Sequence, residues 1–362
     1  MPNQDNLKSL NLMFGSACNL NCGYCLQQSD EKKMNKKANV YDFNFRFMLY
    51  RLSNGLKFSS VHYWGGEPML YWSQIKSVYR YLSGKYSTIK MHRITTNGTL
   101  ITQKYVDFCN AHPDIFTVIS YHDGNISDEQ WKIIGKLNNF SISALIHHKR
   151  LSPLDLRDDY ERIARLIGKR PPISFEMIKA NDGCAPEYWL TREDVETYFE
   201  SMLGIYELAN VSKDDFCRKV IAHFLFRYKK DKEHKGVKPN PCVNENILSI
   251  DLFGNTYNCH HDNSISNITG NIFKPYTPIV TEKPIKIIRL DKYSKSYHCS
   301  HCSAYASCGG GCYTSNTHDV DCFYYQMREQ LAETWLANLD NNNDKPSRIC
   351  QNIQRLSEIS QD

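Results

Sequence analysis

The 362-residue sequence lacks any apolar run long enough to cross a membrane, and its N-terminus lacks the basic-then-apolar pattern of a secretory signal. We therefore expect a soluble, cytoplasmic protein. An excess of one charge is also absent, because 44 Lys and Arg stand against 39 Asp and Glu, for a formal net charge of +5. This balance gives little indication of nucleic-acid binding.

Cysteine, in contrast, is plentiful, with 14 residues. In a reducing compartment so many cysteines do not indicate disulfides, and they favour metal binding instead. Cysteine thiolates bound to iron carry negative charge, so three iron–sulfur clusters would remove about four or five positive charges. The loaded protein would then be close to neutral.

Three cysteines stand close together near the N-terminus, namely Cys18, Cys22 and Cys25, with the spacing C-x3-C-x2-C. Three thiolates on one short loop can hold three irons of a four-iron, four-sulfur cluster and leave the fourth iron without a protein ligand. An open iron is a reaction site, whereas a cluster with four cysteines usually carries electrons. On spacing alone, a zinc loop or a buried apolar cluster remains an alternative.

Three downstream stretches carry motifs that accompany such a loop. Tyr63–Leu70 reads Tyr-Trp-Gly-Gly-Glu-Pro-Met-Leu, and its two glycines let the backbone approach a ligand closely. Arg93–Thr99 ends in Thr-Asn-Gly-Thr, and Val118–Gly124 reads Val-Ile-Ser-Tyr-His-Asp-Gly. Each stretch alone is a weak signal, because Gly-Gly and Asn-Gly also occur in ordinary turns. With the cysteine loop, however, they stand in the order and at the intervals seen in a known enzyme family, and this resemblance weighs against the zinc alternative.

Together the motifs resemble those of the radical S-adenosylmethionine (radical SAM) family. The resemblance implies that SAM chelates the open iron and that one electron cleaves it to methionine and a 5′-deoxyadenosyl radical. It also implies an aromatic residue beside the adenine, a Gly-Gly-Glu segment at the SAM amino group, and polar strand ends that hold other SAM atoms. These residues are Tyr24, Gly65, Gly66, Glu67, Asn97 and Ser120. A flavodoxin or ferredoxin-type protein is the expected electron donor.

Strand-like and helix-like segments alternate along the first half of the chain. Strands are expected at Ser9–Gly15, Ser59–Trp64, Met91–Thr96, Phe116–His122, Ser141–His147 and Ile173–Lys179. Helices are expected at Tyr41–Asn54, Trp72–Ser83, Thr102–Ala111, Asp128–Leu137 and Pro153–Gly168. The alternation predicts an α/β fold with a parallel sheet. It resembles the partial (β/α)6 barrel of the family, whose chemistry lies at the C-terminal ends of the strands.

We expect three parts in the chain: the barrel at residues 1–188, bridging helices and a linker at 189–240, and a small cysteine-rich α+β domain with C-terminal helices at 241–362. The bridging helices are predicted at Leu190–Leu208 and Lys213–Lys230. The basic run Lys229–Lys235 reads as a solvated linker. A hairpin is predicted to turn at Gly254.

Seven cysteines dominate the last part. They are Cys242, Cys259, Cys299, Cys302, Cys308, Cys312 and Cys322. Their order and spacing resemble the SPASM extension of radical SAM enzymes, which holds two auxiliary iron–sulfur clusters, so three [4Fe-4S] clusters are expected in all. The resemblance implies an outer cluster on Cys299, Cys302, Cys308 and Cys322, and an inner one on Cys242, Cys259 and Cys312. A pair of zinc sites is the alternative.

The inner cluster has only three cysteines in this assignment, and residues 236–241 supply no fourth. We predict that its fourth iron is open or bears a ligand such as His260 or His261. The helical patterns around Cys109 and Cys217 favour core positions for both residues. Cys184 follows an Asn-Asp-Gly turn, and the pattern leaves its role open.

The function implied by the resemblance is modification of a ribosomally made peptide, most simply an oxidative crosslink or cyclisation. The barrel is expected to start within the first dozen residues, so leader recognition would come from a separate protein or from the barrel itself. Formylglycine formation is an alternative, but sulfatase-maturating enzymes place an aspartate directly after the residue equivalent to Cys259. Here His260, His261 and Asp262 are the candidate bases. The sequence is also compatible with a small-molecule biosynthetic enzyme and with a zinc scaffold for protein contacts.

Overall fold

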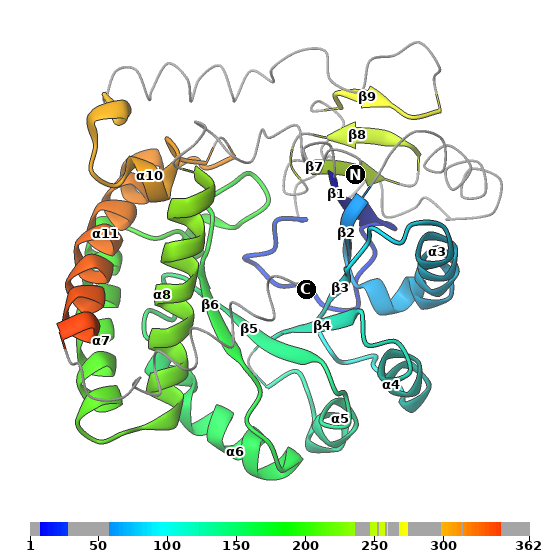
Figure 1. Ribbon diagram of the computed structural model, residues 1–362, viewed down its shortest axis with the longest axis horizontal. Helices are drawn as coiled ribbons and strands as arrows, with labels where there is room; N and C mark the ends of the chain where they lie inside the picture. The colour runs from blue at the N-terminus through cyan, green and yellow to red at the C-terminus, as the bar shows by residue number, and fades with distance from the viewer. Residues whose placement is uncertain are drawn as a thin grey trace. The chain divides into compact units, whose positions relative to one another are not determined.

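The computed structural model in Figure 1 shows the course of the chain. It describes residues 8–27, 58–122, 124–235, 247–251, 253–257, 259, 268–273, 298–312 and 314–341. Contacts divide the chain into two compact units. The first unit comprises Met1–Phe140, Asp182–Ala185 and Cys242–Ile285, and the second comprises Ser141–Asn181, Pro186–Pro241 and Lys286–Asp362. The helix expected at Tyr41–Asn54 lies outside the described residues.

The first unit contains a parallel sheet. Its strands are β1 (Lys8–Met13), β2 (Phe58–Trp64), β3 (Met91–Thr96), β4 (Ile115–Ser120) and β7 (Ile247–Asp251). They lie in the order β4-β3-β2-β1-β7, and every neighbouring pair is parallel. The strands expected from the sequence are confirmed, with ends shifted by at most two residues and β3 in the expected range.

Three helices follow the strands of the first unit: α3 (Trp72–Lys85), α4 (Gln103–Asn110) and α5 (Asp128–Ile134). The side chain of Thr102 caps α4 and that of Ser127 caps α5, as each accepts a hydrogen bond from a backbone N–H in the first turn. Trp72 of α3 makes an edge contact with Tyr105 of α4 at 4.8 Å between ring centroids. The helices predicted here are confirmed.

The predicted hairpin is also confirmed. β7 pairs antiparallel with β8 (Asn255–Tyr257), which pairs with β9 (Gly270–Asn271). Gly254 at the turn has a φ of +76°, and a Cβ there would lie 2.6 Å from the Phe273 ring. The turn therefore requires glycine on both conformational and steric grounds.

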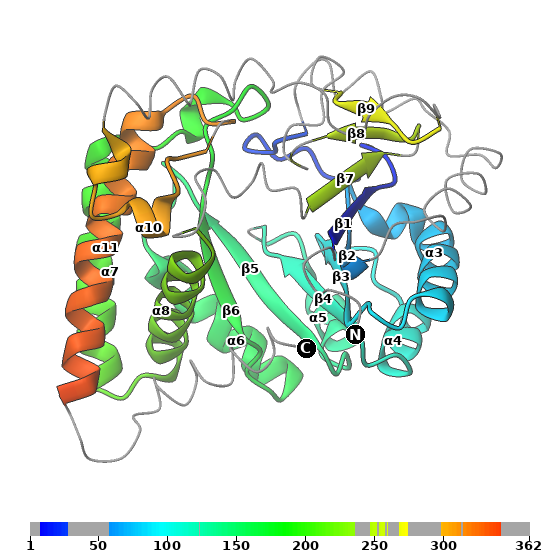
Figure 2. The same cartoon turned by 45° about the horizontal axis from the view of Figure 1, so that its top comes forward.

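The second unit carries the parallel pair β5 (Phe140–Ile146) and β6 (Ile173–Met177). Between them the chain forms the 3-10 turn η4 (Pro153–Leu156) and α6 (Arg157–Ile167), which ends at Gly168 with a φ of +69°. The long helices are α7 (Arg192–Asn210), α8 (Asp215–Lys235) and α11 (His318–Asn341). Figures 1 and 2 show these three helices side by side.

The prediction that the basic run Lys229–Lys235 is a linker is wrong, because α8 continues to Lys235. The physical reason is a set of ion pairs to α11: Lys232 Nζ lies 2.5 Å from Glu333 Oε1 and 3.5 Å from Glu329 Oε1. The charges thus pair along a helix face.

The domain boundaries expected near residues 188 and 240 stay predictions. A membrane-spanning segment is not found among the helices in the described part of the chain.

Candidate functional site

The first cysteine loop, residues 14–27, directly follows β1. Cys18 is exposed, whereas Cys22 and Cys25 are half-buried. The loop folds back on itself through a hydrogen bond from Cys25 N to Cys22 O of 3.0 Å. Backbone N–H groups also point at two sulfurs, from Leu20 to Cys18 and from Gln27 to Cys25, each at 3.4 Å. Such donors stabilise thiolates.

The thiols of this loop repel one another when ionised. The pKa of Cys22 is raised to about 11, first by burial and then by the neighbouring thiols of Cys25 and Cys18, while a hydrogen bond from Tyr24 lowers it. A positively charged metal core removes this repulsion. Within the described ranges, no three His, Cys, Asp or Glu side chains are placed to share one metal ion. In a four-iron cluster each cysteine binds a separate iron, and this loop carries three such thiols.

Gly65 and Gly66 pack directly against the first cysteine loop. Gly66 N donates to Gly15 O at 2.9 Å, and Glu67 N donates to Ala17 O at 2.8 Å. A Cβ at Gly66 would lie 2.1 Å from Ala17 O, and one at Gly65 would lie 2.4 Å from Gly15 O. The two glycines therefore let the end of β2 hold the cysteine loop, backbone to backbone. Their contact with SAM stays a prediction.

Glu67 lies almost entirely inside the protein, with 1% of its surface exposed. Its Oε1 accepts hydrogen bonds from Met69 N at 2.9 Å and Thr96 Oγ1 at 2.6 Å, and its Oε2 accepts one from Asn97 N at 2.8 Å. Burial raises the pKa of Glu67, while these hydrogen bonds lower it. The carboxylate thus ties the end of β2 to the end of β3, and its contact with SAM stays a prediction.

Asn97 joins the end of β3 to the cysteine loop. Its Nδ2 donates to Asn19 Oδ1 at 2.9 Å and lies 3.9 Å from Cys18 Sγ, and its Oδ1 accepts from Thr99 N at 3.0 Å. Ser120 is half-buried at the end of β4. These residues therefore lie at strand ends, and their predicted contacts with SAM remain predictions.

Two further segments contact the cysteine loop and were not predicted from the sequence. Ala185 N donates to Gly23 O at 2.9 Å, and a Cβ at Gly183 would lie 2.5 Å from Leu26 O. The segment Asp182–Ala185 accordingly belongs to the first unit. The sequence signal for this contact was the Asn-Asp-Gly turn before Cys184. The side chain of Cys184 is buried.

The other missed contact comes from His122, two residues beyond β4. Its Nδ1 lies 2.6 Å from Tyr24 Oη and 3.7 Å from Cys22 Sγ. The imidazole also stacks on the Tyr24 ring, with centroids 5.8 Å apart and planes at 19°. The adenine contact predicted for Tyr24 is untested.

Four cysteines of the second unit share one neighbourhood. The turn η8 (Cys299–His301), the short helix α10 (Tyr305–Cys308) and α11 position them. The pKa of Cys322 is raised by burial and then by Cys302 and Cys299. That of Tyr305 is raised by burial and then by Cys299 and Cys308. This arrangement fits the outer cluster expected on these four cysteines, which stays a prediction.

The residues expected at the inner cluster are placed less completely. Cys259 is half-buried in the first unit, and Cys312 is half-buried in the second, with its Sγ 3.1 Å from Thr314 Oγ1. Cys242 and the candidate bases His260, His261 and Asp262 lie outside the described residues. The inner ligand set and the base therefore stay predictions.

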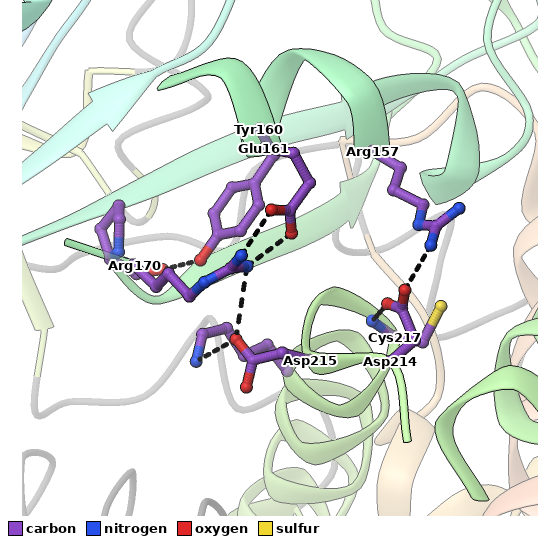
Figure 3. Close-up of polar contacts among 9 residues, drawn as sticks. Arg157, Tyr160, Glu161, Arg170, Asp214, Asp215 and Cys217 are labelled. Atoms are coloured by element: carbon purple, nitrogen blue, oxygen red, sulfur yellow. Dashed lines mark hydrogen bonds and ion pairs between the residues drawn. The ribbon is translucent and has the colours of Figure 1, made fainter. Parts of the chain in front are cut away.

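Cys217 is buried in α8, as predicted. The pKa of its thiol is raised to about 12, chiefly by burial and also by its hydrogen bond to the Asp214 carboxylate. Arg157 of α6 pairs with the same carboxylate, as Figure 3 shows. In the same view Arg170 bridges Glu161 and Asp215. A buried thiol that donates to a carboxylate at a helix contact is a poor iron ligand. The core position predicted for Cys109 is confirmed too.

No family model matches the chain. An uncharacterised protein of Methanocaldococcus jannaschii is 34% identical over 107 residues, or 28% of this chain and 35% of that protein. TigE, a radical SAM cyclopropyl synthase of Paramaledivibacter caminithermalis, is 23% identical over 136 residues, or 34% of this chain and 29% of TigE. The chain thus matches about a third of the length of each relative.

The solved structures match over most of the chain. The structure of anSMEcpe with bound AdoMet and Kp18Cys peptide has a TM-score of 0.66 at 17% identity, covering 92% of this chain and 99% of that one. Streptococcus suis SuiB bound to its precursor peptide SuiA has a TM-score of 0.56 at 15% identity, covering 85% and 72%. This likeness shows the fold. The chain therefore has the mixed α/β fold of these proteins, a partial barrel with a parallel sheet, and it resembles the SPASM-type radical SAM enzymes that its cysteine and glycine motifs indicate.

Proposed function

We propose that the chain is a radical SAM enzyme that oxidatively modifies a peptide substrate, by crosslinking or cyclisation. The observation that carries the proposal is the first cysteine loop. It presents Cys18, Cys22 and Cys25 at the C-terminal ends of parallel strands, where α/β enzymes keep their chemistry.

With a [4Fe-4S] cluster and SAM bound, the site would supply one-electron cleavage of SAM to methionine and a 5′-deoxyadenosyl radical, which abstracts hydrogen from the substrate. The three cysteines would hold the cluster. Gly66, Glu67 and Asn97 fix the loop that carries them, through backbone contacts and a buried carboxylate. A flavodoxin or ferredoxin-type protein would supply the electron.

Both of the solved structures described above contain peptides, which supports a peptide as substrate. The structure of anSMEcpe holds the Kp18Cys peptide, and SuiB holds its precursor peptide SuiA. The downstream cysteines support an oxidation in which the substrate loses two electrons, since the second electron needs an acceptor close by. Auxiliary clusters on these cysteines suit that role.

The test is the mass of the product. The protein, reconstituted with iron and sulfide, is incubated with SAM, a reductant and, in turn, a synthetic peptide for each short reading frame found beside its gene. We expect the peptide mass to fall by about two hydrogens, as ring closure requires. The matched control omits SAM. A mass that is unchanged in H2O but increased in D2O would indicate epimerisation, and a large gain in either solvent would indicate group transfer; each of these results contradicts the proposed oxidation.

A further inference from the structure

His122, Tyr24 and Cys22 form a connected group on the first unit. Tyr24 belongs to the cysteine loop and lies between two of its cysteines, whereas His122 arrives from the end of β4. One imidazole nitrogen, Nδ1, lies 2.6 Å from the Tyr24 hydroxyl and 3.7 Å from the Cys22 sulfur. The parallel stacking of the two rings fixes this orientation. The polar edge of His122 is thus directed at the cysteine loop.

We propose that His122 is a positioning residue that, together with Tyr24, delivers a hydrogen bond to the Cys22 sulfur and raises the reduction potential of the cluster held there. The inference rests on the proposed function, because it assumes that the loop carries an iron–sulfur cluster. In this arrangement Nδ1 carries the proton and donates to Tyr24 Oη at 2.6 Å, which leaves the Tyr24 hydroxyl free to donate its hydrogen to the Cys22 sulfur, with which Tyr24 makes a side-chain hydrogen bond.

The physical reason is charge. Reduction adds an electron to a cluster whose thiolates are already negative, and hydrogen bonds to the sulfurs stabilise the more negative state. A donor at Cys22 therefore moves the potential upward and makes the cluster easier to reduce. The other two sulfurs receive backbone donors from Leu20 and Gln27, so His122 and Tyr24 give the third cysteine a comparable donor from side chains. Residues outside the ligand set commonly tune a metal in this way.

The competing explanation is that His122 only packs against Tyr24. Two substitutions separate the explanations. His122→Phe keeps an aromatic ring for stacking but removes the donor. His122→Asn gives up the stacking but places its amide nitrogen near the position of Nδ1, the atom that makes both contacts. Packing alone predicts that Phe is tolerated better than Asn, and hydrogen bonding predicts the reverse.

The experiment is a redox titration, followed by EPR, of the reconstituted full-length protein; the signal that changes on adding SAM identifies the first cluster. We expect His122→Phe and Tyr24→Phe each to shift the midpoint to a more negative potential, and the double variant to shift it no further than the larger single effect, because the two groups act in series. His122→Asn should stay close to the unsubstituted protein. His112→Phe is the matched control, because the imidazole of His112 stacks on Phe108 and not on the cysteine loop.

A midpoint unchanged in His122→Phe, or a shift in His122→Asn as large as in the Phe variant, overturns the inference. If the clusters load and SAM is cleaved while the potentials stay equal, the proposed function stands and only the role of His122 fails. If the unsubstituted protein loads no cluster that responds to SAM, both the role and the proposed function fail.

Discussion

Replacing Gly66 with alanine should displace the first cysteine loop. A Cβ at this position would lie 2.1 Å from Ala17 O, 2.5 Å from Ala17 C and 2.6 Å from Ser16 C. Because all three atoms belong to the backbone, no side-chain rotation relieves the clash. The loop must move by more than about 1 Å to reach ordinary van der Waals separation.

The cost follows from the contacts that this movement breaks. Overpacking of a tight contact costs about 1–3 kcal/mol. The hydrogen bonds from Gly66 N to Gly15 O and from Glu67 N to Ala17 O contribute roughly 0.5–1.5 kcal/mol each. We therefore expect Gly66→Ala to lose about 3 kcal/mol of stability, or to keep its fold with a shifted loop that no longer holds its iron.

Iron content and EPR of the reconstituted protein measure the effect, alongside urea unfolding. The variant should lose about four irons per chain, the content of one cluster. Gly84→Ala in α3 is the control, because a Cβ there meets nothing within 4 Å, and alanine is the better helix former. Full iron content together with unchanged stability in Gly66→Ala would refute the reasoning.

Other residues give further predictions. Burial lowers the pKa of His92 to about 4 from 6.5, so on acidification the unfolded chain takes up the proton first. The free energy of unfolding should therefore fall by about 2 kcal/mol from pH 7 to pH 5 through this residue. Urea unfolding of His92→Gln at both pH values tests this, and a pH dependence equal to that of the unsubstituted protein would contradict it. Cys217→Ala should keep all of its iron, because the thiol is a buried donor to a carboxylate; loss of one cluster would show a missed ligand. Gly183→Ala should lower the iron content of the first cluster through its clash with the cysteine loop, whereas Gly204→Ala, which adds its Cβ in open space, should not; equal iron in both would exclude the clash.

The strands and helices of the barrel were predictable because each has a local cause. β3 is the clearest case: burial alternates along the strand, as it does when one face of a strand packs inward, and its observed range equals the expected one. α8 shows the limit, since the composition of Lys229–Lys235 indicates a linker. The ion pairs of Lys232 with α11 extend the helix, and those partners are about 100 residues away in sequence.

In the candidate site, too, features with a local cause were predictable from the sequence, and features that depend on distant segments were not. The spacing of the first three cysteines and the Gly-Gly-Glu motif are local, and they predicted which segments would meet. The sequence did not predict that Glu67 would be buried among donors from β3, because that depends on strand neighbours. The contacts of His122 and Gly183 with the loop were missed for the same reason, as they join distant segments of chain.

The central claim is that Cys18, Cys22 and Cys25 hold the cluster that cleaves SAM. The most direct measurement replaces all three with alanine in the full-length protein and follows 5′-deoxyadenosine formation from SAM under dithionite, with iron content measured in parallel. The account predicts that 5′-deoxyadenosine formation stops while about eight irons, those of the two auxiliary clusters, remain. Continued formation of 5′-deoxyadenosine by this variant would contradict the account.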